Sequence, residues 1–347
     1  MIKKMARNVD LRSDTVTLQP EEMKEAMFKA KVGDEYYDDD PTITKLQELA
    51  AERFKKEAGL FIASGTMGNL VGILSQTKRG DVVIEEADSH SLHCEVSNFA
   101  VVGGVLSKQI KGHFGAMDPV DIEAIIPPKG YAYPIASLLL IENTHNAAGG
   151  TCITPKQMAE YREVADKYGL NIHVNGARIF NTAVALGVDP SELAKDADTL
   201  SFCLSKGLAC PFGGVLVGSK EIISRARKYK QMLGGGFRQL GYMAACGIYA
   251  LDNMVNRLAE DHKNAQLLAE GLVELGMGVE LESVQTNMVY FNIPPSLIEA
   301  NEFSEKINSI GGIRMKPPKK NRIRLVTHYG IEKEDVEYFL SKVKDVI

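Results

Sequence analysis

The 347-residue sequence contains no tryptophan and no apolar run of the roughly 18 residues that a membrane-spanning helix needs. Its first residues, 1–7, lack the apolar stretch of a secretory signal peptide. The formal net charge of -5 gives no excess of basic residues for binding nucleic acid. We therefore expect a cytoplasmic protein that binds neither membranes nor nucleic acid.

Closely spaced cysteines are also missing. The five cysteines are odd in number and widely separated, and no two of them have the C-x-x-C spacing typical of zinc sites or redox couples. We expect no metal site, and we expect these residues to be reduced and mostly buried: Cys94, Cys152, Cys203, Cys210 and Cys246.

Short apolar runs alternate with amphipathic stretches through most of the chain. This alternation predicts an α/β fold with a mostly parallel sheet, and the strongly apolar strands predict that helices cover both of its faces. The predicted strands are 82–84, 137–141, 171–174, 199–204 and 214–217, and two of the predicted helices are 155–168 and 220–233.

The pattern changes beyond residue 255, where a long helical stretch runs through residue 275. We predict a large domain over residues 1–255, including an N-terminal arm, and a small C-terminal α+β domain over 256–347. After the long helix, the elements expected in the small domain are 279–283, 287–293, 302–310, 313–316, 322–327 and 332–344.

A glycine-flanked helix start lies at residues 64–69, which read Ser-Gly-Thr-Met-Gly-Asn after a strand-like run at 59–63. Backbone N–H groups there, with the Thr66 hydroxyl, could hold a phosphate at the helix N-terminus. A tight turn without a ligand is the more common meaning of such a segment. This motif alone therefore does not identify a site.

A lysine follows the predicted strand 199–204, since Lys206 stands between Ser205 and Gly207. A lysine in this position could form a Schiff base if its surroundings keep the amine partly neutral. An isolated lysine at a strand end is more often simply solvated. Its interpretation depends on the other residues at the same edge of the sheet.

A third motif makes the pattern specific. Residues 173–178 read His-Val-Asn-Gly-Ala-Arg, and Lys206 lies 31 residues after Asn175 (206 minus 175). This segment resembles the H-x-D-G-A-R motif of the threonine aldolase branch of fold-type I pyridoxal-phosphate (PLP) enzymes, with the S-K-G lysine of that branch after it. The resemblance covers nearly the whole chain, since further matching blocks occur in order at 10–15, 64–69, 87–90, 142–150, 234–239 and 322–328.

The resemblance implies a fold-type I PLP enzyme with its cofactor on Lys206. Gly65, Thr66 and Ser205 would bind the cofactor phosphate, and Arg238 would reach the phosphate of a neighbouring subunit. Enzymes of this branch place residues of two subunits around each cofactor. The resemblance therefore implies a homo-oligomer, either a dimer or a tetramer, with shared active sites.

The resemblance also assigns residues to the ring and the reacting group. His90 would stack on the pyridine ring, and Asn175 and Arg178 would lie near the cofactor. His145 would lie near the β-hydroxyl of the substrate, where it would act with His90. Either histidine could then assist deprotonation of that hydroxyl.

Three residues match positions that hold the substrate carboxylate in this branch: Ser13, Arg178 and Arg324. A guanidinium suits this task because its fork can donate two parallel hydrogen bonds to a carboxylate. Tyr37 matches a tyrosine that often forms part of the site wall. The expected substrate is therefore a small amino acid.

Asn175 departs from the family pattern, which places an aspartate beside the pyridine nitrogen. A carboxylate favours a protonated ring nitrogen, whereas an amide can only hydrogen-bond to it. Three natural explanations stay open: slower aldolase chemistry, a shift to other PLP reactions, or a weakened site. A substitution introduced into the chain would also account for Asn175.

The function that the resemblance favours is cleavage of L-threonine or L-allo-threonine, or a related β-hydroxy-α-amino acid, to glycine and an aldehyde. A β-eliminating lyase or a racemase is the alternative within PLP chemistry. A catalytically weakened PLP-binding homologue is the alternative outside catalysis.

Overall fold

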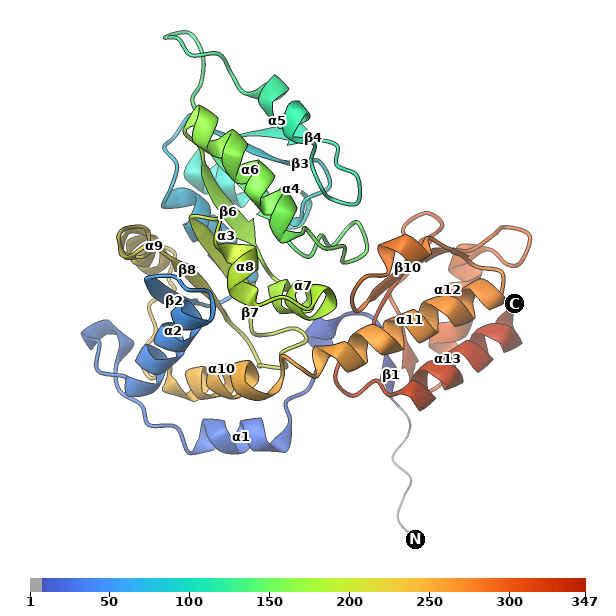
Figure 1. Ribbon diagram of the computed structural model, residues 1–347. Helices are drawn as coiled ribbons and strands as arrows, with labels where there is room; N and C mark the ends of the chain where they lie inside the picture. The colour runs from blue at the N-terminus through green and yellow to red at the C-terminus, as the bar shows by residue number, and fades with distance from the viewer. Residues whose placement is uncertain (1–7) are drawn as a thin grey trace.

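A seven-stranded sheet forms the centre of the computed structural model, which describes residues 8–347 (Figure 1). Its strands are β2 (Ala58–Ile62), β3 (Val82–Glu86), β4 (Leu106–Ile110), β5 (Ala136–Glu142), β6 (Asn171–Asn175), β7 (Thr199–Cys203) and β8 (Gly214–Gly218). They lie in the order β2-β8-β7-β6-β5-β3-β4. The five strands from β7 to β4 are parallel, and β8 is antiparallel to both of its neighbours. The predicted α/β fold with a mostly parallel sheet is confirmed.

Helices cover both faces of this sheet, as the apolar strands predicted. Leu139 and Ile141 of β5 point into one hydrophobic cluster, whereas Leu138 and Leu140 point into another on the opposite face. The second face is covered by α3 (Gly65–Leu74), α9 (Lys220–Met232) and the π-helical turn Phe99–Gly103. The first face is covered by α1 (Glu21–Phe28), α2 (Pro41–Arg53), α5 (Pro119–Ile125), α6 (Pro155–Tyr168), α7 (Ile179–Leu186), α8 (Pro190–Ala194) and α10 (Gly241–Asn253).

The sequence located the buried strands and the helix α6 accurately, and α9 ends one residue before its predicted end. It gave no sign of β4. That strand lies at the sheet edge, and its sequence Leu-Ser-Lys-Gln-Ile leaves an exposed leucine among polar residues. An edge strand of this kind lacks the continuous apolar run that identifies a central strand. Three of the cysteines are buried and all five are free thiols.

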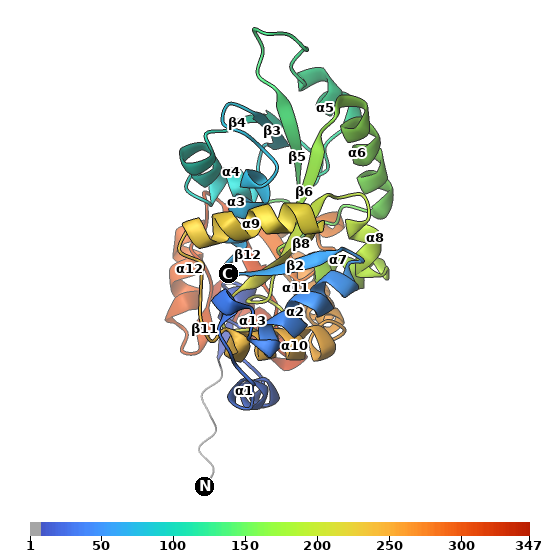
Figure 2. The same ribbon diagram turned by 90° about the vertical axis from the view of Figure 1, so that its left-hand side faces the viewer.

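The C-terminal elements begin with α11 (Leu258–Glu274) and lie to one side of the large sheet (Figures 1 and 2). They continue as β9 (Gly278–Val279), β10 (Met288–Asn292), α12 (Ala300–Ser309), β11 (Ile313–Arg314), β12 (Arg322–Val326) and α13 (Lys333–Val346). A three-stranded antiparallel sheet forms in the order β12-β10-β9. The element expected at 279–283 is only partly a strand. Val279 belongs to β9, but Leu281–Ser283 forms a 3-10 helix in which the Ser283 hydroxyl donates to the Glu280 carbonyl.

The N-terminal arm packs with these C-terminal elements. β1 (Val9–Asp10) pairs in parallel with β11, so the predicted strand at 313–316 joins the arm and not the three-stranded sheet. Val9 and Leu11 are fully buried in the same hydrophobic cluster as α11, β10 and α13. The boundary at residue 255 stays a prediction. The arm reaches this cluster only after folding, which explains why its partner was not visible in the sequence.

Asp40 links two helices of the first face, and its removal tests how firmly they are held. The side chain is fully buried, its Oδ1 accepts from the N–H groups of Thr42 and Ile43 at 3.0 Å, and its Oδ2 accepts from Gly241 N at 2.8 Å. We expect Asp40→Ala to lower the free energy of unfolding by about 2 kcal/mol, measured by chemical denaturation. The control is Asp118→Ala, which removes one exposed cap bond of α5 and should cost about 1 kcal/mol. Equal losses in the two variants would contradict this account.

Candidate active site

Most of the predicted site residues lie where parallel strands end, at one edge of the sheet. His90 opens the short helix α4 (His90–His93) after β3, and His145 follows β5. Asn175 is the last residue of β6, and Ser205 and Lys206 follow β7. The carboxyl ends of parallel strands share one edge, which is where α/β folds bind ligands. We call the edge formed by these five residues the lysine edge.

The first turn of α3 brings unpaired donors to the lysine edge. The Ser64 hydroxyl caps this helix by accepting from Met67 N at 3.2 Å. The N–H groups of Gly65 and Thr66 make no hydrogen bond with the described residues. A Cβ on Gly65 would lie 2.7 Å from Cys203 Sγ, so the glycine lets α3 start close to the end of β7. The positive end of a helix with free N–H groups suits a phosphate.

Lys206 is half-buried and lines a small cleft together with Arg178 and Cys203. Asp14, which is fully buried, lies close enough to interact with its charge. Arg178 donates from Nε to Asp14 Oδ2 and from Nη2 to Oδ1, both at 2.6 Å. Burial alone would raise the pKa of Asp14, but the charge and hydrogen bonds of Arg178, with the nearby charge of Lys206, hold this pKa well below its usual range. An ionised Asp14 therefore fixes Arg178 beside the lysine.

Asp14 is a residue that the sequence reasoning missed. It lies within the matched block at 10–15, directly after Ser13, so its place in that block was the available signal. The structure gives it a further partner, because Asn287 donates from Nδ2 to Asp14 Oδ2 at 3.4 Å, just before β10. One carboxylate thus joins the N-terminal arm, the end of β6 and the C-terminal sheet.

The three residues predicted to hold a carboxylate come from different parts of the chain. Ser13 is buried at the start of the 3-10 turn Asp14–Val16, where its hydroxyl accepts from Thr15 N at 3.3 Å. Arg324 of β12 donates from Nη1 to Asn146 Oδ1 at 2.7 Å and from Nη2 to the Arg12 carbonyl at 3.3 Å. Arg178 uses two of its nitrogens for Asp14, and its Nη1 makes no hydrogen bond with the described residues.

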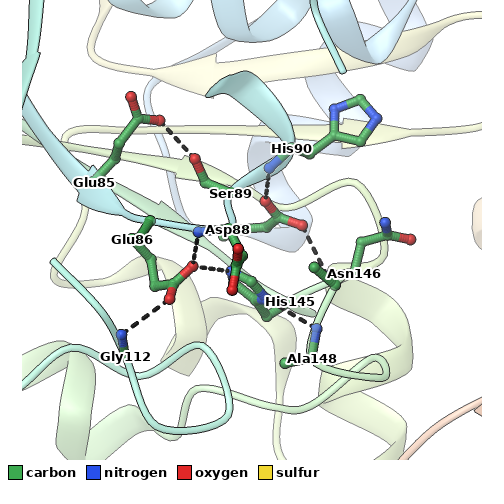
Figure 3. Close-up of polar contacts among 12 residues, drawn as sticks. Glu85, Glu86, Asp88, Ser89, His90, Gly112, His145, Asn146 and Ala148 are labelled. Atoms are coloured by element: carbon green, nitrogen blue, oxygen red, sulfur yellow. Dashed lines mark hydrogen bonds and ion pairs between the residues drawn. The ribbon is translucent and has the colours of Figure 1, made fainter. Parts of the chain in front are cut away.

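Glu142, at the end of β5, connects two segments of the lysine edge, those of His90 and Asn146, which are labelled in Figure 3. Its Oε2 accepts from His90 N at 2.6 Å, and its Oε1 accepts from Asn146 N at 2.8 Å. Asn175 pairs with Glu142 in the sheet and is 3% exposed. Neither Oδ1 nor Nδ2 of Asn175 bonds to any described residue. The amide of Asn175 is therefore free to bond to a ligand at this edge.

The two predicted histidines have different surroundings. The His90 side chain is 33% exposed, and its Nδ1 lies 2.9 Å from Glu95 Oε1. The His145 side chain is 1% exposed, with Nε2 3.0 Å from Glu86 Oε2 and Nδ1 accepting from Ala148 N at 3.3 Å. The His145 contact has the distance of an ion pair but not the alignment of a good hydrogen bond. His90 is therefore the more accessible of the two.

Two predicted site residues lie away from the lysine edge in this chain. The Tyr37 ring packs against Tyr36 and is 73% exposed. Arg238 lies over the Tyr36 ring at 5.2 Å, and its Nη1 is 3.6 Å from Asp34 Oδ1. Within residues 8–347, neither side chain contacts Lys206, the two histidines or the residues predicted to hold the substrate carboxylate. They form a separate exposed group.

The residues at the lysine edge fit PLP. The free N–H groups of Gly65 and Thr66 suit its phosphate, the unpaired amide of Asn175 suits a ring nitrogen, and Lys206 offers an amine to its aldehyde. In the same described range, no group of three or more histidine, cysteine or acidic side chains is placed to hold a metal ion. No helix among those residues is both long and apolar enough to cross a membrane. Fold and site together define a fold-type I PLP enzyme.

Comparison with known proteins narrows this class. The sequence model of the family described as Beta-eliminating lyase matches residues 10–294. The chain is 42% identical over 341 residues to the probable low-specificity L-threonine aldolase 2 of Arabidopsis thaliana, covering 96% of each chain. It is 40% identical over 330 residues to the low specificity L-threonine aldolase of Escherichia coli K12, covering 94% of this chain and 96% of the other.

This protein therefore belongs to the β-eliminating lyase family of PLP-dependent enzymes, in its threonine aldolase branch. A solved structure of Leishmania major threonine aldolase has the same fold, with a TM-score of 0.83, 19% identity and coverage of 97% and 99% of the two chains. The family, fold class and cofactor expected from the motifs are confirmed.

The Glu86–His145 pair makes stability depend on pH in a defined way. Burial would lower the pKa of His145, but the hydrogen bond and charge of Glu86, with the charge of Glu142, raise this pKa overall. Burial would raise the pKa of Glu86, but His145 and the N–H groups of Gly112 and Asp88 lower this pKa to about 2. Protonated His145 stabilises the fold below its ordinary pKa of 6.5, and this contribution disappears as pH rises through its raised pKa. Ionised Glu86 stabilises above 4.5, and this contribution disappears as pH falls toward 2.

Both contributions are complete between pH 4.5 and 6.5. We expect Glu86→Gln to lower the free energy of unfolding by about 2 kcal/mol within this window and by less at higher pH, measured by urea denaturation across pH. Glu123→Gln, which removes an exposed partner of Lys167, is the control and should show no such window. A loss that is the same at every pH would disprove the charged pair.

Proposed function

We propose that this enzyme cleaves L-threonine and L-allo-threonine to glycine and acetaldehyde with PLP bound at Lys206. The names of its full-length relatives support this reaction. We call Ser13, Arg178 and Arg324, which would hold the substrate carboxylate, the carboxylate clamp. The observation that carries the proposal is the position of this clamp beside the lysine, where the buried Asp14 holds Arg178. A protein that only stored the cofactor would have no use for that clamp.

The substrate carboxylate would be held by groups from three segments. Nη1 of Arg178 can donate to it while Nε and Nη2 stay with Asp14. Arg324, fixed by Asn146, would donate from the opposite side, and the Ser13 hydroxyl would add a shorter contact. Charge-assisted bonds of this kind orient an amino acid as well as bind it.

His90 is our proposed base for the β-hydroxyl proton. Its Nε2 makes no hydrogen bond with the described residues, and its side chain is the more exposed of the two histidines. The same ring would stack on the bound cofactor. His145 would have a positioning role. It precedes Asn146, and its pairing with Glu86 would hold this segment in place beside the hydroxylated side chain of the substrate.

Bound PLP supplies a conjugated ring that takes up the electrons left on Cα when the Cα–Cβ bond breaks. Asn175 would hydrogen-bond to the ring nitrogen. Its neutral amide gives less stabilisation to a protonated nitrogen than a carboxylate would. We therefore propose a working aldolase that is slower than it would be with an aspartate at this position.

Two other functions remain candidates because of Asn175. A β-eliminating lyase or racemase would form pyruvate from serine derivatives or invert the substrate, without releasing an aldehyde. A weakened PLP-binding protein would take up the cofactor and convert no substrate. The intact clamp and the accessible His90 favour the aldolase over both.

We further propose a homo-oligomer, a dimer or a tetramer, in which Arg238 reaches the phosphate of a neighbouring subunit and Tyr37 lines that site. Both side chains are exposed and lie apart from the lysine edge of their own chain. Gly65, Thr66 and Ser205 would bind the phosphate within the chain. A cytoplasmic location remains the prediction made from the sequence.

The test is aldehyde release from L-threonine and L-allo-threonine by the PLP-loaded protein. We expect release with accumulation of glycine, and no release by Lys206→Ala. Asn175→Asp should raise kcat/KM by about tenfold, equivalent to about 1.4 kcal/mol of transition-state stabilisation. Release by the variant alone would show that the unaltered chain is a weakened form. No release from any β-hydroxy amino acid by either protein would refute the proposal.

A further inference from the structure

The two nitrogens of the His90 ring face different environments. Nδ1 lies 2.9 Å from Glu95 Oε1, whose side chain is 1% exposed. Nε2 has no hydrogen-bond partner among residues 8–347, and the His90 side chain is 33% exposed. A carboxylate can only accept hydrogen bonds. Nδ1 therefore carries a proton, which leaves the lone pair of a neutral ring on Nε2.

Glu95 is held in place by two further donors. Asn69 of α3 donates from Nδ2 to Glu95 Oε1 at 2.7 Å, and Asn98 donates from Nδ2 to Oε2 at 3.3 Å. Asn69 in turn accepts at Oδ1 from the Ser201 hydroxyl of β7 at 2.9 Å. Three donors around one buried carboxylate are what its charged form requires.

Contacts of the buried His173 determine which atom of the Asn69 amide donates to Glu95. His173 is fully buried, and burial lowers its pKa to about 3, so the ring is neutral and carries one proton. Its Nε2 lies 3.4 Å from Asn69 Oδ1, and its Nδ1 lies 2.7 Å from Thr199 Oγ1. Thr199 itself accepts from Gln76 Nε2 at 2.8 Å.

A single consistent assignment satisfies this chain of contacts. Gln76 donates to Thr199, Thr199 donates to Nδ1 of His173, and Nε2 of His173 donates to Asn69. Asn69 then donates to Glu95, so every donor points toward that carboxylate. The reverse orientation of the Asn69 amide would set its oxygen against Glu95. The chain of contacts crosses α3, β6 and β7. Thr66 lies in α3, Asn175 ends β6, and Lys206 follows β7.

We propose that Glu95 is a positioning residue that keeps the proton of His90 on Nδ1 and so presents Nε2 as the acceptor for the β-hydroxyl proton of the substrate. This role rests on the proposed aldolase function. As the O–H bond breaks, the proton moves to Nε2, the oxygen electrons form the aldehyde C=O, and the Cα–Cβ electrons pass to the bound cofactor. His90 then gives its proton to solvent, and a proton from solvent ends on Cα.

The charge of Glu95 matters because His90 becomes positively charged in this step. Glu95 faces the ring nitrogen directly, whereas Glu142 of β5 faces the His90 backbone N–H. Arg324 of β12 contacts Asn146 beside Glu142, and Asn69 of α3 is neutral. Glu95 is thus the carboxylate placed to stabilise an imidazolium at this position.

Glu95→Gln tests the charge while keeping the shape. The new amide oxygen can still accept from His90 and Asn69. Its NH2 group would replace Oε2 beside Asn98, whose buried Oδ1 has no hydrogen-bond partner and could accept from it after a rotation of the Asn98 amide. The variant therefore need not leave a buried polar group unpaired.

Two reactions of the PLP-loaded protein distinguish a role of Glu95 in proton removal from a purely structural role. Threonine cleavage requires removal of the hydroxyl proton, whereas exchange of the α-hydrogen of glycine in D2O uses the same lysine, clamp and cofactor but involves no hydroxyl. We expect Glu95→Gln to lower kcat for threonine by about 100-fold and to leave glycine exchange within about twofold.

An equal loss in both reactions would mean that Glu95 is only structural, and an unchanged kcat would mean that it has no role in the step; either result overturns the proposal. If Glu95→Gln does not retain PLP, the second variant is Glu95→Asp, which keeps the charge but places the carboxylate further from the His90 ring. We still expect it to lower kcat for threonine cleavage more than the rate of glycine exchange. The control is Glu123→Gln on α5, which should change neither reaction. If the unaltered protein exchanges glycine hydrogens but cleaves no hydroxy amino acid, the proposed function itself fails, and this role with it.

Discussion

The buried ion pair between Asp14 and Arg178 is the interaction on which the site depends. Arg178 precedes α7, just after β6, Asp14 lies on the N-terminal arm, and Asn287 precedes β10 and donates to the same carboxylate. Each charge would be costly to bury alone, since an unpaired ion in the interior loses its hydration without compensation. The arm, the large sheet and the C-terminal sheet must therefore meet for either group to be stable, and the substrate clamp forms where they meet.

Carboxylates behind the lysine edge share this task with Asp14. Glu142 fixes the backbone of His90 and Asn146, Glu86 fixes His145, and Glu95 fixes the His90 ring. All three side chains are buried, and each accepts from donors on at least two segments of the chain. Rigid support of this kind holds the groups that face substrate within the narrow range that catalysis requires.

Much of this could be predicted from the sequence, and the exceptions have physical reasons. The apolar strands and the glycine, lysine and arginine motifs are local signals, so they located the central strands and the start of α3 and put Asn175 and Lys206 at the ends of two strands. The pairing of β1 with β11 and the contact of Asp14 with Arg178 join positions that are distant along the chain, and one sequence gives no sign of such partners. Glu95 and Glu142 were missed for the same reason, because a buried carboxylate cannot be distinguished from a surface one until its donors are known.

The most direct test of the account is the affinity of the PLP-loaded protein for glycine, which needs the carboxylate clamp but no hydroxyl chemistry. It can be measured from the change in the visible spectrum of the cofactor in the unaltered protein and in Asp14→Asn. Loss of the charge that holds Arg178 should raise the Kd for glycine by about 30-fold, equivalent to about 2 kcal/mol, while PLP stays bound. An unchanged glycine affinity in a variant that retains PLP would contradict the central place given to this ion pair.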